Sequence, residues 1–356
     1  MSRTPLLETR NLTVGYRRSG HPARAVIRKI NTCLNAGEFV CLLGPNGAGK
    51  STLIRTLSGM QKPITGEVKL LGTSLSSLSA RETARRMSLV LTDRPAVGWM
   101  PAAALVAMGR HPYTCWRGRL KQEDEAVVWQ AMMDAGVETL AHRPLCDLSD
   151  GERQKVMIAR ALAQEPRIML LDEATAFLDL PRRVELMYML QDLARRGERA
   201  VLLSTHDLDL ALRCADRLWL IPAKGALLEG APEDLVLNGA LAEAFSGSDA
   251  RFDEGAGAFT LPRALRGTVA LKGDGIPGMW TYRALERAGY RIIAADQSPL
   301  MVEVSRNDGV TTWRIHDGGG SRDVLPSIEL LLKRLPLFQQ SGRAGCQNSF
   351  AEGVPT

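Results

Sequence analysis

The sequence predicts an α/β fold for about the first two thirds of the chain, followed by a small α+β domain. Three segments support this prediction. A glycine-rich loop stands between an apolar strand and a helix at residues 39–58, and two further apolar strands, at 167–172 and 200–203, end in acidic or polar residues. Ligands of open α/β sheets bind at the edge formed by the carboxyl ends of the strands. The three segments therefore predict one site.

The loop is the strongest of these signals. It reads Gly44-Pro45-Asn46-Gly47-Ala48-Gly49-Lys50-Ser51-Thr52 and matches the phosphate-binding pattern G-x-x-x-x-G-K-[ST] at every fixed position. Residues 39–43 predict a buried strand, and residues 51–58 predict a helix that stops at Gly59. Glycines let backbone N–H groups turn toward a phosphate, and the helix N-terminus adds partial positive charge. We expect Lys50 to reach the β- and γ-phosphates and the Ser51 hydroxyl to hold Mg²⁺.

A second helix start follows at Leu148-Ser149-Asp150-Gly151-Glu152. Ser149 and Glu152 have the spacing of a capping box, and the residues after them are apolar at helical intervals. The free N–H groups of such a helix make an anion site. Taken alone, the segment is best explained as an ordinary capped helix.

Two strands carry the predicted chemistry at their ends. Residues 167–171 are followed by Asp172 and Glu173, and residues 200–203 by Ser204-Thr205-His206-Asp207. Asp172 is placed to reach the Mg²⁺ shell, and Glu173 to polarise a water molecule. A strand that ends in polar residues before a turn is the alternative explanation for either segment by itself.

In this order and spacing, the segments resemble the ATP-binding cassette (ABC) ATPases over about residues 5–246. The resemblance implies a P-loop NTPase fold of the ABC type, with ATP and Mg²⁺ as ligands. A helical insert is expected at about residues 93–165, and the spacing leaves no room for the long coiled coil of chromosome-maintenance relatives. The loop alone would be ambiguous among kinases, GTPases and other ATPases.

The resemblance also implies roles for individual residues. Tyr16 stands where the family has an aromatic residue that stacks on adenine. Glu173 corresponds to the general base, Asp172 to the carboxylate of the Mg²⁺ shell, and His206 to the switch residue near the γ-phosphate. Lys50 and the loop amides would neutralise the charge that develops during phosphoryl transfer.

A homodimer is implied by the remaining motifs. The segment with Ser149 and Gly151 looks like the family signature, which closes on the γ-phosphate held by the opposite subunit. Asp179 matches the loop that links the two sites. Two chains would then share two ATP molecules at a two-fold interface.

Two positions depart from the family pattern. Thr92 stands where the family usually has a glutamine that touches Mg²⁺ or water, and Asp93 follows it. The threonine hydroxyl can still reach a metal through water, so Thr92 is retained as a metal-site candidate. Asp150 stands where the signature usually has glycine, and its carboxylate is expected to point away from the phosphates.

The helical insert indicates which branch of the family the chain resembles. Residues 105–113, Leu-Val-Ala-Met-Gly-Arg-His-Pro-Tyr, look like the segment of importer ATPases for ferric siderophores, haem and cobalamin. The resemblance implies two transmembrane permease subunits and an external solute-binding protein as partners. It also implies a peripheral position on the inner, cytoplasmic face of the cell membrane. His111 has no partner at metal-ligand spacing, so we expect an interface or structural role.

Composition agrees with these expectations. The 356 residues are 45% hydrophobic and 24% charged, with a net charge of +6. The basic residues are dispersed, so no nucleic-acid partner is expected. Six cysteines without a C-x-x-C pair indicate reduced thiols rather than a zinc site. The apolar core of a signal peptide is missing from the N-terminal residues, so we expect a cytosolic protein.

The last third of the chain predicts a linker at 247–265, an α+β accessory domain at 266–336 and a disordered tail at 337–356. In the accessory domain we expect Trp280 and Trp313 to be core anchors. The expected order is strand, helix, three strands and helix, at residues 267–272, 279–288, 291–295, 300–305, 311–316 and 323–334.

The leading prediction is the ATPase subunit of an importer for an iron chelate, haem or cobalamin. The alternative from another class is a soluble ABC ATPase that remodels a protein or nucleic-acid complex. A third reading, prompted by Thr92, is a regulator that binds ATP and hydrolyses it poorly.

Overall fold

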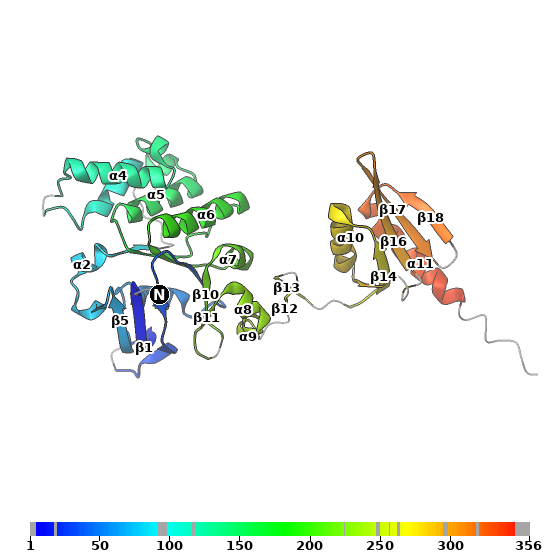
Figure 1. Cartoon of the computed structure of the whole chain (residues 1–356), viewed down its shortest axis with the longest axis horizontal. Helices are drawn as coiled ribbons and strands as arrows, with labels where there is room; N and C mark the ends of the chain where they lie inside the picture. Colours follow the sequence, from blue (N-terminus) through cyan, green and yellow to red (C-terminus); the bar gives the residue numbers. More distant parts are fainter. Residues whose placement is uncertain are drawn as a thin grey trace, which may run out of the picture. The chain divides into compact units, whose positions relative to one another are not determined.

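The computed structural model describes residues 5–17, 20–91, 98–115, 118–223, 225–246, 250–255, 257–261, 264–294, 298, 300–317 and 320–345. By its contacts the chain divides into two compact units, Met1–Thr260 and Leu261–Thr356. Each unit is described by itself, with the labels of Figure 1.

A six-stranded sheet forms the centre of unit 1. In sheet order its strands are β11 (Leu228–Gly230), β10 (Arg217–Leu220), β4 (Phe39–Leu43), β9 (Ala200–Ser204), β8 (Ile168–Asp172) and β7 (Met87–Val90). All neighbours are parallel except β11, which is antiparallel to β10. Strands β4, β8 and β9 are buried along their whole length, which explains why each is a continuous apolar run. The strands predicted around residues 39–43, 167–172 and 200–203 are therefore confirmed.

The register of this sheet brings the predicted strand ends together. Ser204 pairs with both Leu42 and Asp172 across its two neighbouring strands. The carboxyl ends of β4, β9 and β8 therefore lie at one edge of the sheet, where the phosphate-binding loop also begins.

A second, antiparallel sheet lies beside the helix that follows this loop. It contains β2 (Arg24–Ile30), β1 (Leu7–Tyr16), β5 (Thr65–Leu70) and β6 (Thr73–Ser74), with β3 (Cys33–Leu34) paired to β1. Helix α1 (Lys50–Leu57) buries Leu53 and Ile54 in a core that also contains Leu12 of β1 and Leu42 of β4. This core fixes the position of α1, and with it the position of the loop.

The opposite face of the parallel sheet carries most of the helices. Phe39 and Cys41 of β4 point into this second core, whereas Val40 and Leu42 point into the first. In Figure 1, α4, α5 and α6 lie on one side of the sheet, and β1 and β5 lie on the other. The helices of unit 1 that follow α1 are α2 (Ala80–Ala84), α3 (Ala102–Ala107), α4 (Gln122–Asp134), α5 (Asp150–Leu162), α6 (Leu180–Arg196), α7 (Leu208–Cys214), α8 (Pro232–Leu237) and α9 (Ala240–Ala244).

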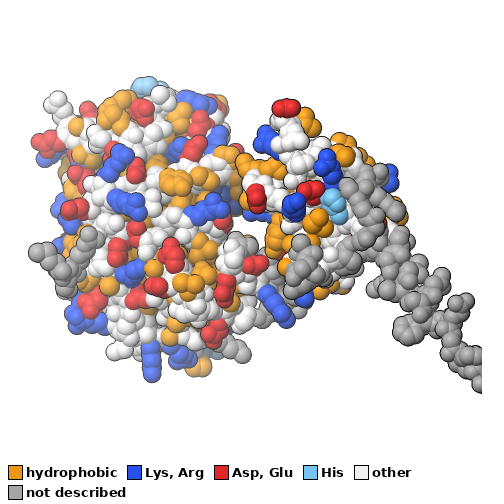
Figure 2. All heavy atoms as spheres, turned by 45° about the vertical axis from the view of Figure 1, so that its right-hand side comes forward, with side chains coloured by type: hydrophobic (Ala, Val, Ile, Leu, Met, Phe, Trp, Pro, Cys, Tyr) orange, Lys and Arg blue, Asp and Glu red, His pale blue; other side chains and the backbone are white. Residues whose placement is uncertain are grey.

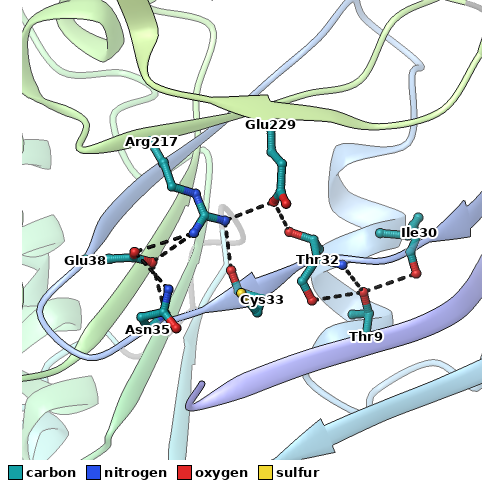
Figure 3. A network of polar contacts seen from close by, with 8 residues as sticks. All are labelled: Thr9, Ile30, Thr32, Cys33, Asn35, Glu38, Arg217 and Glu229. Atoms are coloured by element: carbon teal, nitrogen blue, oxygen red, sulfur yellow. Dashed lines mark hydrogen bonds and ion pairs between the residues drawn. The ribbon is translucent and has the colours of Figure 1, made fainter. Parts of the chain in front are cut away.

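A polar network joins the two sheets at the edge opposite the predicted site (Figure 3). The Arg217 guanidinium of β10 contacts the Glu38 carboxylate at 3.4 Å and the Glu229 carboxylate at 2.9 Å, and it donates to the Cys33 carbonyl at 3.0 Å. The Thr32 hydroxyl donates to the same Glu229 carboxylate. One side chain of the parallel sheet thereby fixes the turn that leads into β3.

The segment predicted to be a linker contains regular structure. Strands β12 (Arg251–Asp253) and β13 (Ala258–Thr260) form a hairpin. Phe252 and Phe259 meet edge to face at 5.3 Å between ring centroids, and Phe259 meets Phe245 in the same way at 5.2 Å. These aromatic contacts attach the hairpin to unit 1, which ends at Thr260 rather than at the predicted domain end, residue 246.

Unit 2 is a mixed five-stranded sheet with two helices. In sheet order the strands are β15 (Tyr290–Ile293), β14 (Gly267–Lys272), β16 (Leu300–Asn307), β17 (Val310–Asp317) and β18 (Gly320–Leu325), and the helices are α10 (Gly275–Arg287) and α11 (Ile328–Gly345). Strand β14 is parallel to both of its neighbours, whereas β16, β17 and β18 are antiparallel. Val269, Val302, Leu285 and Leu331 share one core, in which the Trp313 indole N–H donates to the Thr281 hydroxyl at 2.8 Å.

Three expectations for unit 2 need correction. Residues 323–334 are not one helix, because 320–325 form β18 and the helix begins at Ile328. Pro326 disfavours helical geometry at the residue before it, and the Ser327 hydroxyl accepts from the N–H of Leu330 in the first turn of α11. Trp280 is 53% exposed and is not a core anchor, whereas Trp313 is buried as expected. Residues 337–345, predicted to belong to a tail, continue α11.

Within the described ranges, no helix combines the length and the apolar character that a bilayer span needs. Cys41 is buried in β4, as expected for a core residue. On the face drawn in Figure 2, basic and acidic side chains are interspersed over unit 1, without a continuous field of one sign.

Candidate nucleotide-binding and hydrolysis site

The phosphate-binding loop connects β4 to α1 with left-handed backbone at Gly47 and Gly49. Gly49 occupies the cap position of α1, and a Cβ there would lie 2.5 Å from the Val26 side chain. Glycine is therefore required at this position both by the backbone and by the packing. The cap has no side-chain hydrogen bond, so the first N–H groups of α1 remain available to an anion.

Lys50 lies at the start of α1 and is only 5% exposed. Its ammonium donates to the carbonyl oxygens of Gly44 at 2.9 Å and Pro45 at 3.3 Å. Burial lowers the pKa of Lys50, while the carboxylates of Glu173 and Asp172 act in the opposite direction. The Lys50 hydrogen bonds go to neutral carbonyl oxygens, so its positive charge is available to a polyphosphate ligand.

One serine organises the two predicted carboxylates. The Ser204 hydroxyl, fully buried at the end of β9, donates to Asp172 at 2.6 Å and accepts from the Glu173 N–H at 2.9 Å. The Ser204 carbonyl accepts from the same N–H at 3.1 Å. Asp172 is 4% exposed, so its carboxylate is held in a fixed orientation at the sheet edge.

Glu173 leaves the line of the strand. Its φ of 51° is left-handed, a conformation that is uncommon for residues other than glycine. Its carboxylate lies 2.7 Å from the His206 Nε2, and the two side chains are 31% and 47% exposed. Glu173 and His206 therefore form a solvent-accessible pair beside the buried Asp172.

The available oxygen ligands fit a magnesium ion. The Asp172 carboxylate and the Ser51 hydroxyl supply hard oxygen donors. No group of three or more histidine, cysteine or acidic side chains suited to a metal occurs among the described residues. Mg²⁺ commonly takes only one or two protein ligands and completes its shell with water and phosphate oxygens.

The predicted signature segment is a capped helix. The Ser149 hydroxyl accepts from the Glu152 N–H, and the Glu152 carboxylate accepts from the Ser149 N–H at 2.8 Å, which completes the predicted capping box. Asp150 lies 3.9 Å from the Arg153 guanidinium, which partly offsets its charge. Asp179 caps α6 by accepting from the Arg182 N–H at 3.1 Å.

The remaining candidates lie at both ends of the loop region. Tyr16 ends β1, is 51% exposed, and its hydroxyl is 2.8 Å from the Thr52 hydroxyl in α1. The ring therefore stands next to the phosphate-binding helix with a face open to a ligand. Thr92 and its neighbour Asp93 lie outside the described residues.

An ion network attaches segment 105–113 to the helical subdomain, which is formed by α3, α4 and α5. Arg110 is 5% exposed, and its guanidinium contacts Asp124 at 2.9 Å and Glu165 at 2.7 Å. Burial would lower the pKa of Arg110, but its hydrogen bonds to Glu165 and Asp124 outweigh burial and raise it. The same guanidinium stacks 3.9 Å from the centroid of the Tyr113 ring. Sequence reasoning missed this structural role of Arg110.

A surface groove of about 500 Å³ adjoins this network. Its lining is largely apolar and includes Ala104, Ala107, Met108 and Leu120, with His111 among the polar members. Met108 is 46% exposed. His111 therefore lies at a surface that a partner can reach.

Comparison with known proteins agrees with this geometry. Residues 27–176 match the family model described as ABC transporter, and residues 266–336 match the one described as Iron ABC transporter C-terminal domain. The chain is 40% identical over 256 residues to an uncharacterized ABC transporter ATP-binding protein of Methanocaldococcus jannaschii. This match covers 72% of this chain and 87% of the relative. It is 36% identical over 230 residues to the ferric enterobactin transport ATP-binding protein FepC of Escherichia coli, covering 65% and 83%.

Solved structures give the same result. This chain resembles a chain of a metal-chelate type ABC transporter in an inward-facing conformation, with a TM-score of 0.58 and 27% identity. The match covers 68% of this chain and 89% of that chain. A dimeric bacterial ABC transporter cassette has a TM-score of 0.54 and 26% identity, covering 64% and 98%. The chain therefore belongs to the ABC transporter ATP-binding proteins, which are ATPases coupled to transport, and it carries the iron ABC transporter C-terminal domain.

Proposed function

We propose that this chain is the ATP-hydrolysing subunit of an importer for an iron chelate of the siderophore type. One observation supports the hydrolytic part of this proposal. Five side chains lie at the same edge of the parallel sheet: Lys50, Asp172, Glu173, Ser204 and His206. The iron-chelate part is supported by the match of residues 266–336 to an iron transporter domain and by the similarity to a ferric enterobactin transport protein. Haem and cobalamin are alternative cargoes of the same importer class.

In this proposal some residues of the site bind the nucleotide and others activate the attacking water. The loop amides and Lys50 hold the β- and γ-phosphates, and Tyr16 stacks on the adenine ring. Ser51 and Asp172 would hold Mg²⁺, and the ion would neutralise charge on the phosphates. Glu173 orients the attacking water and takes its proton. His206, 2.7 Å from the Glu173 carboxylate, fixes that carboxylate in position.

Two copies of the chain complete each site in this proposal. The capped N-terminus of α5, with Ser149 and Gly151, faces the γ-phosphate held by the second copy, and Asp179 lies in the linking loop. The similarity to a dimeric cassette supports this assembly. ATP then stabilises the closed dimer, and loss of the γ-phosphate reopens it.

The closing motion needs partners to move a cargo. Two transmembrane permease subunits are proposed to dock in the groove beside Met108 and His111, since its apolar lining is exposed at a fixed part of the helical subdomain. An external solute-binding protein would deliver the chelate. The chain would then lie on the inner face of the cell membrane.

Substitution of the proposed base tests the hydrolytic part. Glu173→Gln is expected to bind ATP, to form an ATP-dependent dimer and to lose nearly all hydrolysis, because the amide cannot accept the proton of water. Glu125→Gln, an exposed position on α4, serves as the matched control and should hydrolyse ATP like wild type. Wild-type turnover in Glu173→Gln would remove Glu173 as the base.

Reconstitution tests the cargo. The chain is purified with its permease from native membranes and placed in proteoliposomes, and uptake of a ferric siderophore is compared with uptake of haem and of cobalamin. ATP-dependent uptake of the ferric siderophore alone is expected. Exclusive uptake of cobalamin or haem would overturn the iron-chelate assignment, and copurification with soluble partners only would overturn import.

A further inference from the structure

Arg182 lies beside the predicted signature serine, in the first turn of α6. Its Nη1 donates to the Ser149 hydroxyl at 2.8 Å, and its Nε is 3.8 Å from the Asp179 carboxylate. The guanidinium therefore bridges the capped start of α5 and the loop that carries Asp179. Neither the sequence motifs nor the comparisons assign it a role.

The packing of Gly151 shows how closely Arg182 approaches the α5 terminus. A Cβ on Gly151 would lie 2.5 Å from Arg182 Nη1 and 2.7 Å from its Cδ. Glycine at this position thus makes room for the arginine side chain. Both residues also line a cavity of about 220 Å³ between α5 and α6.

The charges around Ser149 show why a cation is needed there. Asp150 and Glu152 place two carboxylates in the first turn of α5, where they oppose an approaching anion. Their charges are partly met by other arginines, since Asp150 lies 3.9 Å from Arg153 and Glu152 lies 3.5 Å from Arg143. Arg182 instead directs its guanidinium at the serine hydroxyl, and its side chain is 42% exposed.

We propose that Arg182 is a ligand of the terminal phosphate of the nucleotide held by a second copy of this chain, and that it binds this phosphate beside Ser149. The inference rests on the proposed function, because it takes the α5 terminus to face that phosphate. Because the guanidinium is 2.8 Å from the Ser149 hydroxyl, there are positions at which one phosphate oxygen can hydrogen-bond to both groups. The planar guanidinium is well suited to phosphate, and its charge offsets the nearby carboxylates.

The hydrogen-bond arrangement changes in a defined way on binding. The Ser149 hydroxyl now donates to the Glu152 carboxylate at 2.8 Å and accepts from Arg182. When the hydroxyl donates to the phosphate, the Arg182 guanidinium pairs with the same phosphate. The Asp179 cap is kept throughout, because its donor is the backbone N–H of Arg182.

The test measures ATP-dependent dimerisation of the full chain in the Glu173→Gln background by light scattering across protein concentrations. The two-fold dimer contains two such contacts, so Arg182→Ala is expected to weaken it about 100- to 10,000-fold, which is about 10- to 100-fold for each charge-assisted hydrogen bond. Arg182→Lys should recover part of the loss. ATP affinity of the isolated subunit should not change, because its own loop is intact. Arg196→Ala, an arginine on the same helix paired with Asp192, is the matched control and should dimerise like Glu173→Gln.

A double-mutant cycle separates direct phosphate binding from positioning of the serine. In a Ser149→Ala background, Arg182→Ala should still weaken the dimer about tenfold or more. Equal dimer constants with and without Arg182 in that background would overturn direct contact.

Different results overturn the ATP-sandwiched dimer and the role of Arg182. If Glu173→Gln stays monomeric with ATP, the proposed ATP-sandwiched dimer falls and this inference falls with it. If Glu173→Gln dimerises and Arg182→Ala does not weaken it, only the inference about Arg182 is overturned.

Discussion

Replacing Asp124 by asparagine tests whether the buried ion network holds the helical subdomain together. Asp124 Oδ1 accepts from Arg110 Nε at 2.9 Å, and the two side chains are 9% and 6% exposed. Asparagine keeps the shape and one acceptor oxygen but removes the negative charge. The Arg110 guanidinium would then remain buried with only one acidic partner, Glu165.

The size of the effect follows from burial. Removing one partner of a buried pair costs about 3–5 kcal/mol, because the remaining charge is left without compensation. Glu165 remains 2.7 Å from Arg110, but it is 53% exposed and solvent screens its charge. We therefore expect a loss near the lower limit, about 3 kcal/mol, which raises the open population of the subdomain about 100-fold.

Hydrogen exchange of individual backbone amides in the full-length protein measures how often the subdomain opens. The amides of α3 and α4 should exchange about 100-fold faster in Asp124→Asn at pH 7. Asp134→Asn is the matched control on the same helix, because Asp134 is exposed and accepts a hydrogen bond from Gln130 of the same helix. Exchange in Asp124→Asn that matches the Asp134→Asn control would refute the reasoning.

The pH dependence gives a second check with a defined sign. The Lys121 N–H and the Arg110 guanidinium hold the pKa of Asp124 below its ordinary value. A carboxyl group with a lowered folded-state pKa contributes stability above its unfolded-state pKa, about 3.9. That contribution is lost as pH falls through the folded-state pKa. The difference between wild type and Asp124→Asn should therefore be constant from about pH 5 to 8 and shrink in stronger acid.

Three further substitutions test other parts of the fold. Gly109→Ala should destabilise unit 1 by about 1–3 kcal/mol in urea unfolding, because its Cβ would lie 2.2 Å from the Arg160 carbonyl. Thr281→Val should destabilise unit 2 by about 1–3 kcal/mol, measured by the fluorescence of Trp313, because the buried indole N–H loses its acceptor. Arg217→Met should lower the free energy of unfolding of unit 1 by about 1–3 kcal/mol in urea, since it removes a donor that two carboxylates and one carbonyl share.

Two control variants accompany these tests, a conservative one at Thr281 and a matched one at the exposed Arg213. Thr281→Ser keeps the hydroxyl and should unfold close to wild type. Arg213→Met removes an exposed arginine that pairs with Asp209 only within its own helix, so it should change stability by less than about 0.5 kcal/mol. Equal destabilisation by Arg213→Met and Arg217→Met would contradict the role given to the network of Figure 3.

The sequence predicted β4, β8 and β9 because these strands are buried on both faces. A strand with two buried faces needs a continuous apolar run, and β4, β8 and β9 are such runs. Strand β18 was missed for the opposite reason. It lies at the sheet edge, Val324 is 57% exposed, and apolar residues at 324, 328, 331 and 332 imitate a helical period. The proline at 326 was the available signal against a continuous helix.

The candidate site was predictable where function depends on strand ends and loop sequence. Lys50, Asp172 and Glu173 could be placed together because parallel strands end at one edge of the sheet. The contacts of Ser204 and Arg182 could not be foreseen, since each joins residues about 30 positions apart that meet only in the folded protein. Both are ordinary polar residues by type, and only their neighbours give them a role.

Arg110 shows a further limit of motif reasoning. Its segment, 105–113, was interpreted by resemblance as typical of importer ATPases, with an interface or structural role expected for His111, and the structure gives Arg110 and His111 different positions. Arg110 is buried and holds α3, α4 and the end of α5 together, whereas His111 lines the groove. The rigidity of the groove therefore depends on an ion pair behind it. A partner docked there would contact a surface whose position is fixed by buried charge.

The geometry of Asp172 and Glu173 explains how two adjacent carboxylates can serve different purposes. Along a strand, successive side chains point to opposite faces, so both could not reach one nucleotide if the strand continued through Glu173. The left-handed backbone at Glu173 ends the strand and turns its carboxylate toward His206, while Ser204 holds Asp172 within the sheet edge. Because the Glu173 N–H bonds to both the hydroxyl and the carbonyl of Ser204, one residue stabilises the strained backbone and orients the buried acid. The strain of Glu173 is thus held by the same contact that positions Asp172, and the buried acid and the exposed acid are fixed relative to each other.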